Sequence, residues 1–328
     1  MTSPSIDWRE QIAADEAARF AGYARELGAL QAAQSKKYGV GRALHRKQLF
    51  ACEAQFEVLG NLPAHARYGL FKQAATYQAL IRLSNGSFAK QNDRIPDIRG
   101  FAIKVLGIEG PSALGGTTQA QDFLLINREV FGMKNSAEFM GLVLASAKGG
   151  LGLISYFLTS FGLFDGMKRL GSIVSSLRKP FTGFATEAFF SAAPLACGPY
   201  AVRVRLLPAS QEPAVGAAAD WGQDMQNRLG KESLSYDFQL QFFVNEKLTP
   251  IEDGTVNWAE QDAPYVTVAR LRLPKQNFSE AQSQAIAGKV EKAAFDPWCA
   301  LLEHKPLGDV MRARKDTYFV SQNNRGKV

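Results

Sequence analysis

Two residues near the carboxyl end of the chain have a spacing that could bind a metal ion. Arg314 and Tyr318 are four positions apart, and Arg325 follows seven positions later. On a helix, which turns about 100° per residue, the three side chains would lie on one stripe. A guanidinium one turn from a phenol favours the phenolate form, which is an iron ligand in some haem proteins. The spacing therefore predicts a haem site with Tyr318 as the axial ligand of the iron.

This short motif needs support from other segments of the chain. Arg19 and Tyr23 have the same spacing inside an ordinary amphipathic helix pattern. With this many arginines and tyrosines, roughly half a match is expected by chance. Agreement between distant segments is what would distinguish Tyr318 from a packed tyrosine.

Length and composition predict one folded domain in a reducing compartment. The chain has 328 residues, 46% of them hydrophobic, and neither a repeat nor a low-complexity linker divides residues 1–328. Its three cysteines are widely separated and form no CxxC pair, so neither a zinc site nor a disulfide framework is indicated. The amino terminus is polar and acidic before any apolar run, unlike a signal peptide. A cytoplasmic protein is the expectation.

The charge pattern gives no sign of nucleic-acid binding. The formal net charge is +7, but the basic residues are dispersed along the chain and are not interleaved with aromatic residues.

One segment is unusually apolar. Residues Gly141–Phe164 carry a single charge, Lys148, and contain several glycines. The run after Lys148 is shorter than the roughly 20 residues that span a bilayer, so a buried helical hairpin is favoured. The alternative is an apolar surface that docks on a membrane or admits a lipid-like substrate.

The hydrophobic periodicity predicts an α+β fold with an antiparallel β-barrel or sheet and flanking helices. Strands are grouped together and helices are set apart, which differs from alternating βαβ units. Alternating or β-branched runs predict strands at residues 78–83, 100–106, 200–207, 236–244 and 265–273. Helices are predicted at residues 8–35, 137–177, 279–293 and 307–323. The first belongs to an N-terminal helical segment, 1–35, and the last two to a C-terminal helical segment, 279–328.

Three further segments could surround a reactive ligand. His65 follows a proline and is flanked by alanines, and a neutral imidazole can exchange protons near neutral pH. Arg82 and Ser84 lie on one face of a predicted strand, where Arg82 could bind a carboxylate and Ser84 could bond to an imidazole. Asn127 ends a mostly apolar run, so it is either a turn residue or a ligand contact.

Together these segments resemble the haem catalase family. The matching elements are the His-Ala-Arg turn at His65, the Arg82-x-Ser84 strand, the stretch from Asp93 through Lys104, the Asn127 strand, and the Arg314-x-x-x-Tyr318 helix. The segments Pro250–Asp253 with Trp258, and Phe295–Trp298, are similar to those of the small catalase-related haem proteins. The resemblance implies a catalase-type barrel that binds haem b.

The resemblance also implies a role for each matching residue. His65 would be the acid/base above the haem, Ser84 would orient His65, and Asn127 would hold the peroxide by a hydrogen bond. Tyr318 would bind the iron and Arg314 would keep it as a phenolate. The remaining expected cofactor contacts are Arg82 and Arg325 at the haem propionates and Phe139 on the haem face.

Two positions depart from the family pattern. The family has an arginine three residues before its distal histidine, where this chain has Leu62 before His65. The residue directly before the histidine is valine in true catalases and threonine in allene oxide synthases, where this chain has Ala64. A small side chain there would widen the pocket.

The implied function is that of a catalase-related peroxidase. Its substrate would be hydrogen peroxide or, preferentially, an organic or fatty-acid hydroperoxide. Two alternatives are a fatty-acid hydroperoxide isomerase or lyase of the allene oxide synthase type, and a haem carrier or sensor without turnover. NADPH is a second cofactor that the family allows, and a monomer or homodimer is expected.

Overall fold

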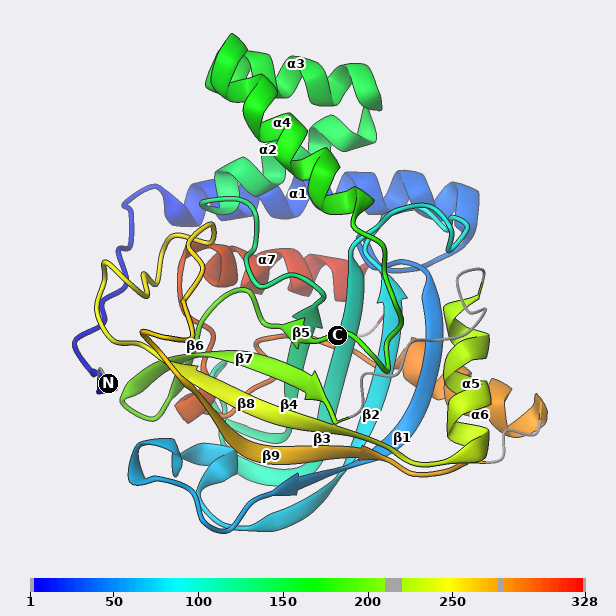
Figure 1. The fold of residues 1–328 in the computed structure, drawn as a ribbon. Helices are drawn as coiled ribbons and strands as arrows, with labels where there is room; N and C mark the ends of the chain where they lie inside the picture. The colour runs from blue at the N-terminus through cyan, green and yellow to red at the C-terminus, as the bar shows by residue number, and fades with distance from the viewer. Residues whose placement is uncertain (1–2, 210–219, 277–279, 327–328) are drawn as a thin grey trace.

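A closed antiparallel β-barrel forms the centre of the molecule. The computed structural model describes residues 3–209, 220–276 and 280–326. In this part of the chain the strand order is β5-β4-β3-β2-β1-β9-β8-β7, and β5 also pairs with β7 and closes the ring, while β6 extends the sheet beyond β7 (Figure 1). The strands are β1 (Gln48–Val58), β2 (Ala75–Asn85), β3 (Arg99–Pro111), β4 (Thr117–Ile126), β5 (Phe189–Phe190), β6 (Leu195–Cys197), β7 (Tyr200–Pro208), β8 (Leu234–Phe242) and β9 (Tyr265–Leu273).

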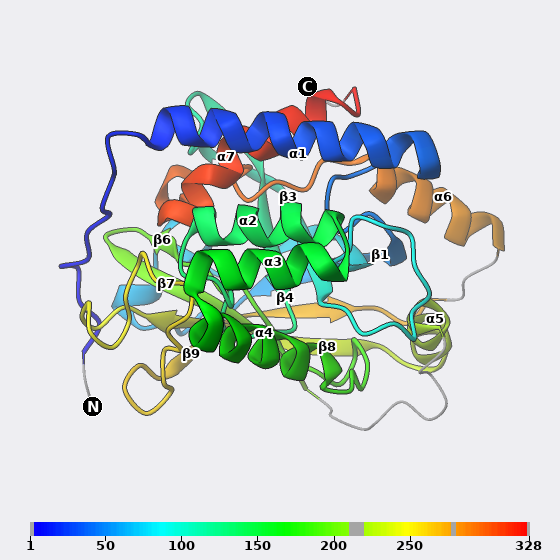
Figure 2. The same ribbon diagram turned by 90° about the horizontal axis from the view of Figure 1, so that it is seen from above.

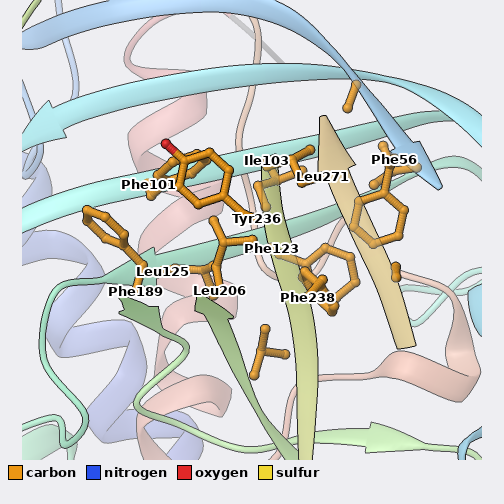
Figure 3. Packing of buried hydrophobic residues seen from close by; sticks show 14 of the residues in the cluster. Phe56, Phe101, Ile103, Phe123, Leu125, Phe189, Leu206, Tyr236, Phe238 and Leu271 are labelled. Atoms are coloured by element: carbon orange, nitrogen blue, oxygen red, sulfur yellow. The ribbon is translucent and has the colours of Figure 1, made fainter. Parts of the chain in front are cut away.

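Alternation of side chains builds the barrel interior. In β1, Cys52, Ala54 and Phe56 are buried, whereas Glu53 and Gln55 between them are exposed, as expected for a strand with one face in a core. Aromatic rings from opposite strands meet inside the barrel, and Phe238 lies 4.8 Å from Phe123 and 5.1 Å from Phe56 between ring centroids (Figure 3). The barrel is therefore a packed core, and a ligand site has to lie outside it.

Helices cover the outside and one end of the barrel. They are α1 (Glu16–Tyr38), α2 (Ser136–Ala147), α3 (Gly150–Phe161), α4 (Leu163–Arg178), α5 (Trp221–Lys231), α6 (Glu280–Lys292) and α7 (Asp309–Asn323). Figures 1 and 2 show α1 and α7 running side by side above the barrel, with α2 next to them and α3 and α4 projecting farther outward. Among the described residues, no helix combines the length and the apolar character needed to cross a membrane.

The α+β class and the antiparallel barrel are confirmed, and several boundaries are corrected. The helix predicted from residue 8 begins at Glu16, because Trp8 donates a hydrogen bond to the Pro199 carbonyl and Gln11 donates one to Glu252. These contacts hold the first residues of the chain away from a helix. Residue 279, where the C-terminal helical segment was predicted to begin, lies outside the described residues.

Candidate active site

Arg314 and Tyr318 lie on one face of α7, as their spacing predicts. The Arg314 guanidinium donates a hydrogen bond of 2.7 Å to the Tyr318 hydroxyl and lies 5.0 Å from the ring centroid. The other pair with this spacing has different contacts, because Arg19 pairs with Asp309 at 3.0 Å. A charged donor directed at the phenol oxygen stabilises negative charge on that oxygen. Arg314 and Tyr318 are therefore suited to bind a metal cation through the phenol oxygen.

A histidine lies beside Ser84, and it is His45. The Nδ1 atom of His45 is 3.0 Å from the Ser84 Oγ atom. Gly100 on β3 makes room for this pair, because a Cβ atom there would lie 2.6 Å from His45 Nδ1 and 2.8 Å from Ser84 Oγ. When Nδ1–H donates to the serine, the Nε2 atom of the neutral imidazole is free to accept a proton.

The surroundings of His45 keep its imidazole neutral. Burial, together with the positive charges of Arg82, Arg314 and Arg42, lowers the pKa of His45 to about 3. A neutral imidazole can act as a proton acceptor throughout the physiological pH range.

Four arginines gather around His45 and Tyr318. Besides Arg314 they are Arg42 from the loop before β1, Arg82 from β2 and Arg325 just after α7. Arg82 is 2% exposed and donates to the His45 carbonyl at 2.9 Å. The cluster thus carries a strong local excess of positive charge.

One carboxylate, Glu291 on α6, contacts this arginine cluster. Its side chain lies 2.8 Å from Arg42 and 3.2 Å from Arg82, and its backbone carbonyl accepts from Arg325 at 2.7 Å. Burial and the positive charge of Arg42 together lower the pKa of Arg82 to about 9 and that of Arg325 to about 10. Further anionic groups would stabilise the cluster.

Asn127 lies at the edge of this site, and both ends of its amide are bonded. Its Oδ1 atom accepts from the Arg99 backbone N–H at 2.8 Å, and its Nδ2 atom donates to Glu187 at 3.3 Å. Arg99 is the neighbour of Gly100, so Asn127 is joined to the strand that contacts His45. Since an amide nitrogen carries two hydrogens, the second is left for another acceptor.

Phe139 lies among apolar residues next to the His45 loop. Its ring is 4.9 Å from that of Phe131, and Phe139 and Leu44 both pack against a buried cluster that contains Ala43. Phe139 therefore shares an apolar cluster with the segment that leads to His45.

The predicted partnership between Ser84 and His65 is wrong. The His65 ring instead packs 4.6 Å from Phe242 and 6.1 Å from Tyr200. His45 precedes β1 and His65 follows it, and an eleven-residue strand spans up to roughly 35 Å. The two histidines therefore lie at opposite ends of β1, and only His45 is at the end where Ser84 bonds to an imidazole.

The family spacing can be compared for both histidines. Leu62 stands three residues before His65, whereas Arg42 stands three residues before His45, and the residue directly before His45 is Leu44. The widened pocket deduced from Ala64 would not apply to a site at His45. Arg42 with His45 was the signal that could have identified the histidine beside Ser84, whereas nothing in the local pattern distinguishes Glu291.

The described residues fit a haem group in the chemistry of their donors. A phenol oxygen that accepts from Arg314 suits a ferric iron. Among the described residues, Glu291 is the acidic side chain that pairs with Arg42 and Arg82, and these two arginines together with Arg325 suit two propionate carboxylates. Arg42 and Arg82, together with Arg325, would hold the propionates, and Tyr318 would hold the iron.

Solved catalases share this fold. A fungal catalase aligns over 88% of this chain and 59% of its own length, with a TM-score of 0.69 and 17% sequence identity. Catalase A from Saccharomyces cerevisiae aligns over 87% and 61%, with a TM-score of 0.67 and 19% identity. A bacterial catalase aligns over 100% and 63%, with a TM-score of 0.65 and 14% identity.

The chain therefore has the catalase fold, and it spans about three-fifths of the length of these catalases. No protein-family model matches the sequence, and a search of curated proteins finds no match.

Proposed function

We propose that this protein is a haem-dependent enzyme that breaks the O–O bond of peroxides. The observation that carries the proposal is the joint arrangement of two pairs, His45 with Ser84 and Arg314 with Tyr318, at one arginine-rich site. The catalase fold supports the proposal. When bound, the haem would supply a redox-active iron that accepts an oxygen atom from the peroxide.

The chain's own residues would move the proton. The free Nε2 atom of neutral His45 takes the proton from one peroxide oxygen and returns it to the other. The O–O bond then breaks, and the outer oxygen leaves as water or an alcohol. Ser84 holds the imidazole in the required tautomer, and the second Nδ2 hydrogen of Asn127 orients the peroxide.

Replacement of His45 tests the enzyme. We expect His45→Ala to lower kcat/KM for peroxides by about 10²–10⁴-fold, because general acid/base catalysis is lost, while the haem absorption spectrum persists. His65→Ala is the matched control and should retain activity. Full activity in His45→Ala, or loss only in His65→Ala, would contradict the assignment.

Replacement of Tyr318 tests the iron ligand separately. Tyr318→Phe should abolish the high-spin ferric spectrum of the wild-type protein, because the ring loses its only donor atom. Persistence of that spectrum would show that another residue binds the iron. A haem carrier or sensor would instead show a normal spectrum in the wild type and no peroxide turnover.

The substrate that we favour is an organic or fatty-acid hydroperoxide. The support for it is the apolar cluster around Ala43, two residues before His45, against which Leu44 and Phe139 pack. Steady-state kcat/KM should therefore be higher for an alkyl hydroperoxide than for hydrogen peroxide, and the reverse ranking would refute this preference. A rearranged product from a fatty-acid hydroperoxide, formed without an added electron donor, would indicate an isomerase of the allene oxide synthase type.

A further inference from the structure

Large apolar side chains are exposed on the α3–α4 pair. Leu151 and Phe164 are 84% and 87% exposed, the highest values among the large hydrophobic residues of the described chain. The others on these helices are Ile154, Leu163, Met167 and Val174. Single exposed apolar residues are normal on a protein surface, but a group of six on two neighbouring helices indicates a surface that binds a partner.

The helices hold these side chains in a fixed arrangement. α3 and α4 are joined at Gly162, and a Cβ atom at Gly166 would lie only 2.4 Å from the Phe157 carbonyl oxygen, so the two backbones are in close contact. On α4, Phe164, Met167 and Val174 follow helical spacing along one stripe. The pair projects away from the barrel, so this stripe is accessible (Figures 1 and 2).

The charges around this stripe are almost all positive. Between residues 141 and 180 the basic residues are Lys148, Lys168, Arg169, Arg178 and Lys179, and Asp165 is the only acidic residue. Arg169 is bonded to Glu138 on α2, but the four other basic residues are exposed. Exposed apolar side chains bordered by basic ones are typical of helices that lie in the headgroup region of an anionic membrane.

We propose that α3 and α4 dock this protein onto a membrane surface that carries anionic lipids. With 12 and 16 residues, the helices are roughly 18 and 24 Å long, shorter than the roughly 30 Å hydrocarbon core, so they would lie along the interface. A second copy of the chain fits less well, because a two-fold pairing would bring the basic residues together.

Flotation with lipid vesicles tests the docking surface. The full chain should bind vesicles of phosphatidylcholine with roughly 30% phosphatidylglycerol, which gives the vesicles a negative surface. It should bind vesicles of pure phosphatidylcholine only weakly. The double variant Leu163→Ser/Phe164→Ser should lose binding by roughly tenfold or more. Lys168→Glu/Lys179→Glu should lose binding to the anionic vesicles by a similar factor.

Leu114→Ser is the matched control, because Leu114 is 53% exposed in the turn between β3 and β4, away from these helices. It should bind like the wild type, and unchanged circular dichroism should show that every variant is folded. Absence of wild-type binding to both vesicles would overturn the proposal. A dimer in sedimentation without lipid that Leu163→Ser/Phe164→Ser dissociates, with no vesicle binding, would assign the surface to a second copy instead.

Discussion

Ser84 has a predicted effect that depends on its hydroxyl alone. Its Oγ atom is 3.0 Å from His45 Nδ1, and its side chain is buried on β2. We expect Ser84→Ala to lower kcat for peroxides by about 10- to 100-fold, because the imidazole loses the partner that fixes its tautomer. Steady-state kinetics on the haem-loaded protein measures this effect.

Two observations distinguish positioning from a general structural effect. Ser84→Thr retains the hydroxyl and should recover most of the activity lost in Ser84→Ala. The haem spectrum and the melting temperature should be the same in all three proteins. If Ser84→Thr were as impaired as Ser84→Ala, the hydroxyl would not be the relevant group.

His304 makes the stability of the protein sensitive to acid. The Leu70 N–H donates to its Nε2 atom at 2.9 Å, and its Nδ1 atom is 3.1 Å from the Ala196 carbonyl, so a neutral ring satisfies both contacts. Burial lowers the pKa of His304 from 6.5 to about 4. Below about pH 6.5 the unfolded chain takes up a proton that the folded chain refuses, so stability falls as the pH decreases towards 4.

Urea unfolding at pH 7 and pH 5 measures this loss. His304 should contribute about 2 kcal/mol to the difference in free energy of unfolding between the two pH values. His304→Gln keeps an acceptor and a donor but does not titrate, so its stability should depend less steeply on pH. His45 contributes in the same direction, because its pKa is also lowered, to about 3. An unchanged pH dependence in His304→Gln would contradict the prediction.

At the residue scale, the sequence was informative where the functional residues are close together. Arg314 and Tyr318 are one helical turn apart, so their contact follows from helix geometry. The choice between His45 and His65 depends instead on which end of β1 meets Ser84 and α7. That end is fixed by the pairing of β1 with β2, in which Gln48 lies opposite Ser84, and a local pattern does not encode it.

At the element scale, α7 is held in place by an ion-pair cluster around Arg312. The Arg312 guanidinium lies 2.6 Å from Glu10, 2.7 Å from Glu16 and 3.0 Å from Glu252. It thereby joins α7 to α1 and to the segments that precede α1 and follow β8. Because Tyr318 is on the same helix, these contacts also position the proposed iron ligand.

Replacement of Arg312 should therefore affect both stability and haem binding. Arg312→Met removes the guanidinium that three partly buried carboxylates share, which should cost about 2–4 kcal/mol of unfolding free energy. The pKa of Glu16 is lowered chiefly by its hydrogen bond to Arg312, so this contribution is present above about pH 4.5 and is lost in more acidic solution. Chemical unfolding and haem titration measure the two effects.

Arg169→Met is the matched control for Arg312→Met. The Arg169 side chain is 43% exposed, and its guanidinium pairs with Glu138 at 3.3 Å. An exposed pair contributes about 1 kcal/mol or less, so this variant should retain stability and haem affinity. Equal losses in both variants would show that α7 does not depend on the Arg312 cluster.

Periodicity identified most elements but not their limits. The predicted strand at residues 265–273 coincides with β9, and the helical region predicted at 137–177 consists of α2, α3 and α4. Gly149 and Gly162 have positive φ angles, 82° and 77°, and they separate the three helices. β1 was missed because its alternating small and polar residues give a weak signal without the opposite strands.

At the scale of the whole molecule, the candidate site is assembled from parts that are distant in sequence. His45 comes from the loop before β1, Arg82 from β2, Glu291 from α6, and Tyr318 with Arg325 from the end of the chain. Only the closed barrel with α7 above it brings these residues together. The positive charge of the arginines opposes this assembly until anionic groups neutralise it.

Haem loading should therefore stabilise the whole fold. A ligand at 100 times its dissociation constant adds about 2.7 kcal/mol, which for a chain of this size raises Tm by about 4 °C. The gain should be smaller for Tyr318→Phe, which lacks the iron ligand, and for Arg82→Met, which lacks a propionate partner. Arg270→Met, which removes a half-exposed pair with Asp237, should keep the full gain. Equal Tm values with and without haem in the wild type would mean that the arginine cluster neutralises its charge through some other anion.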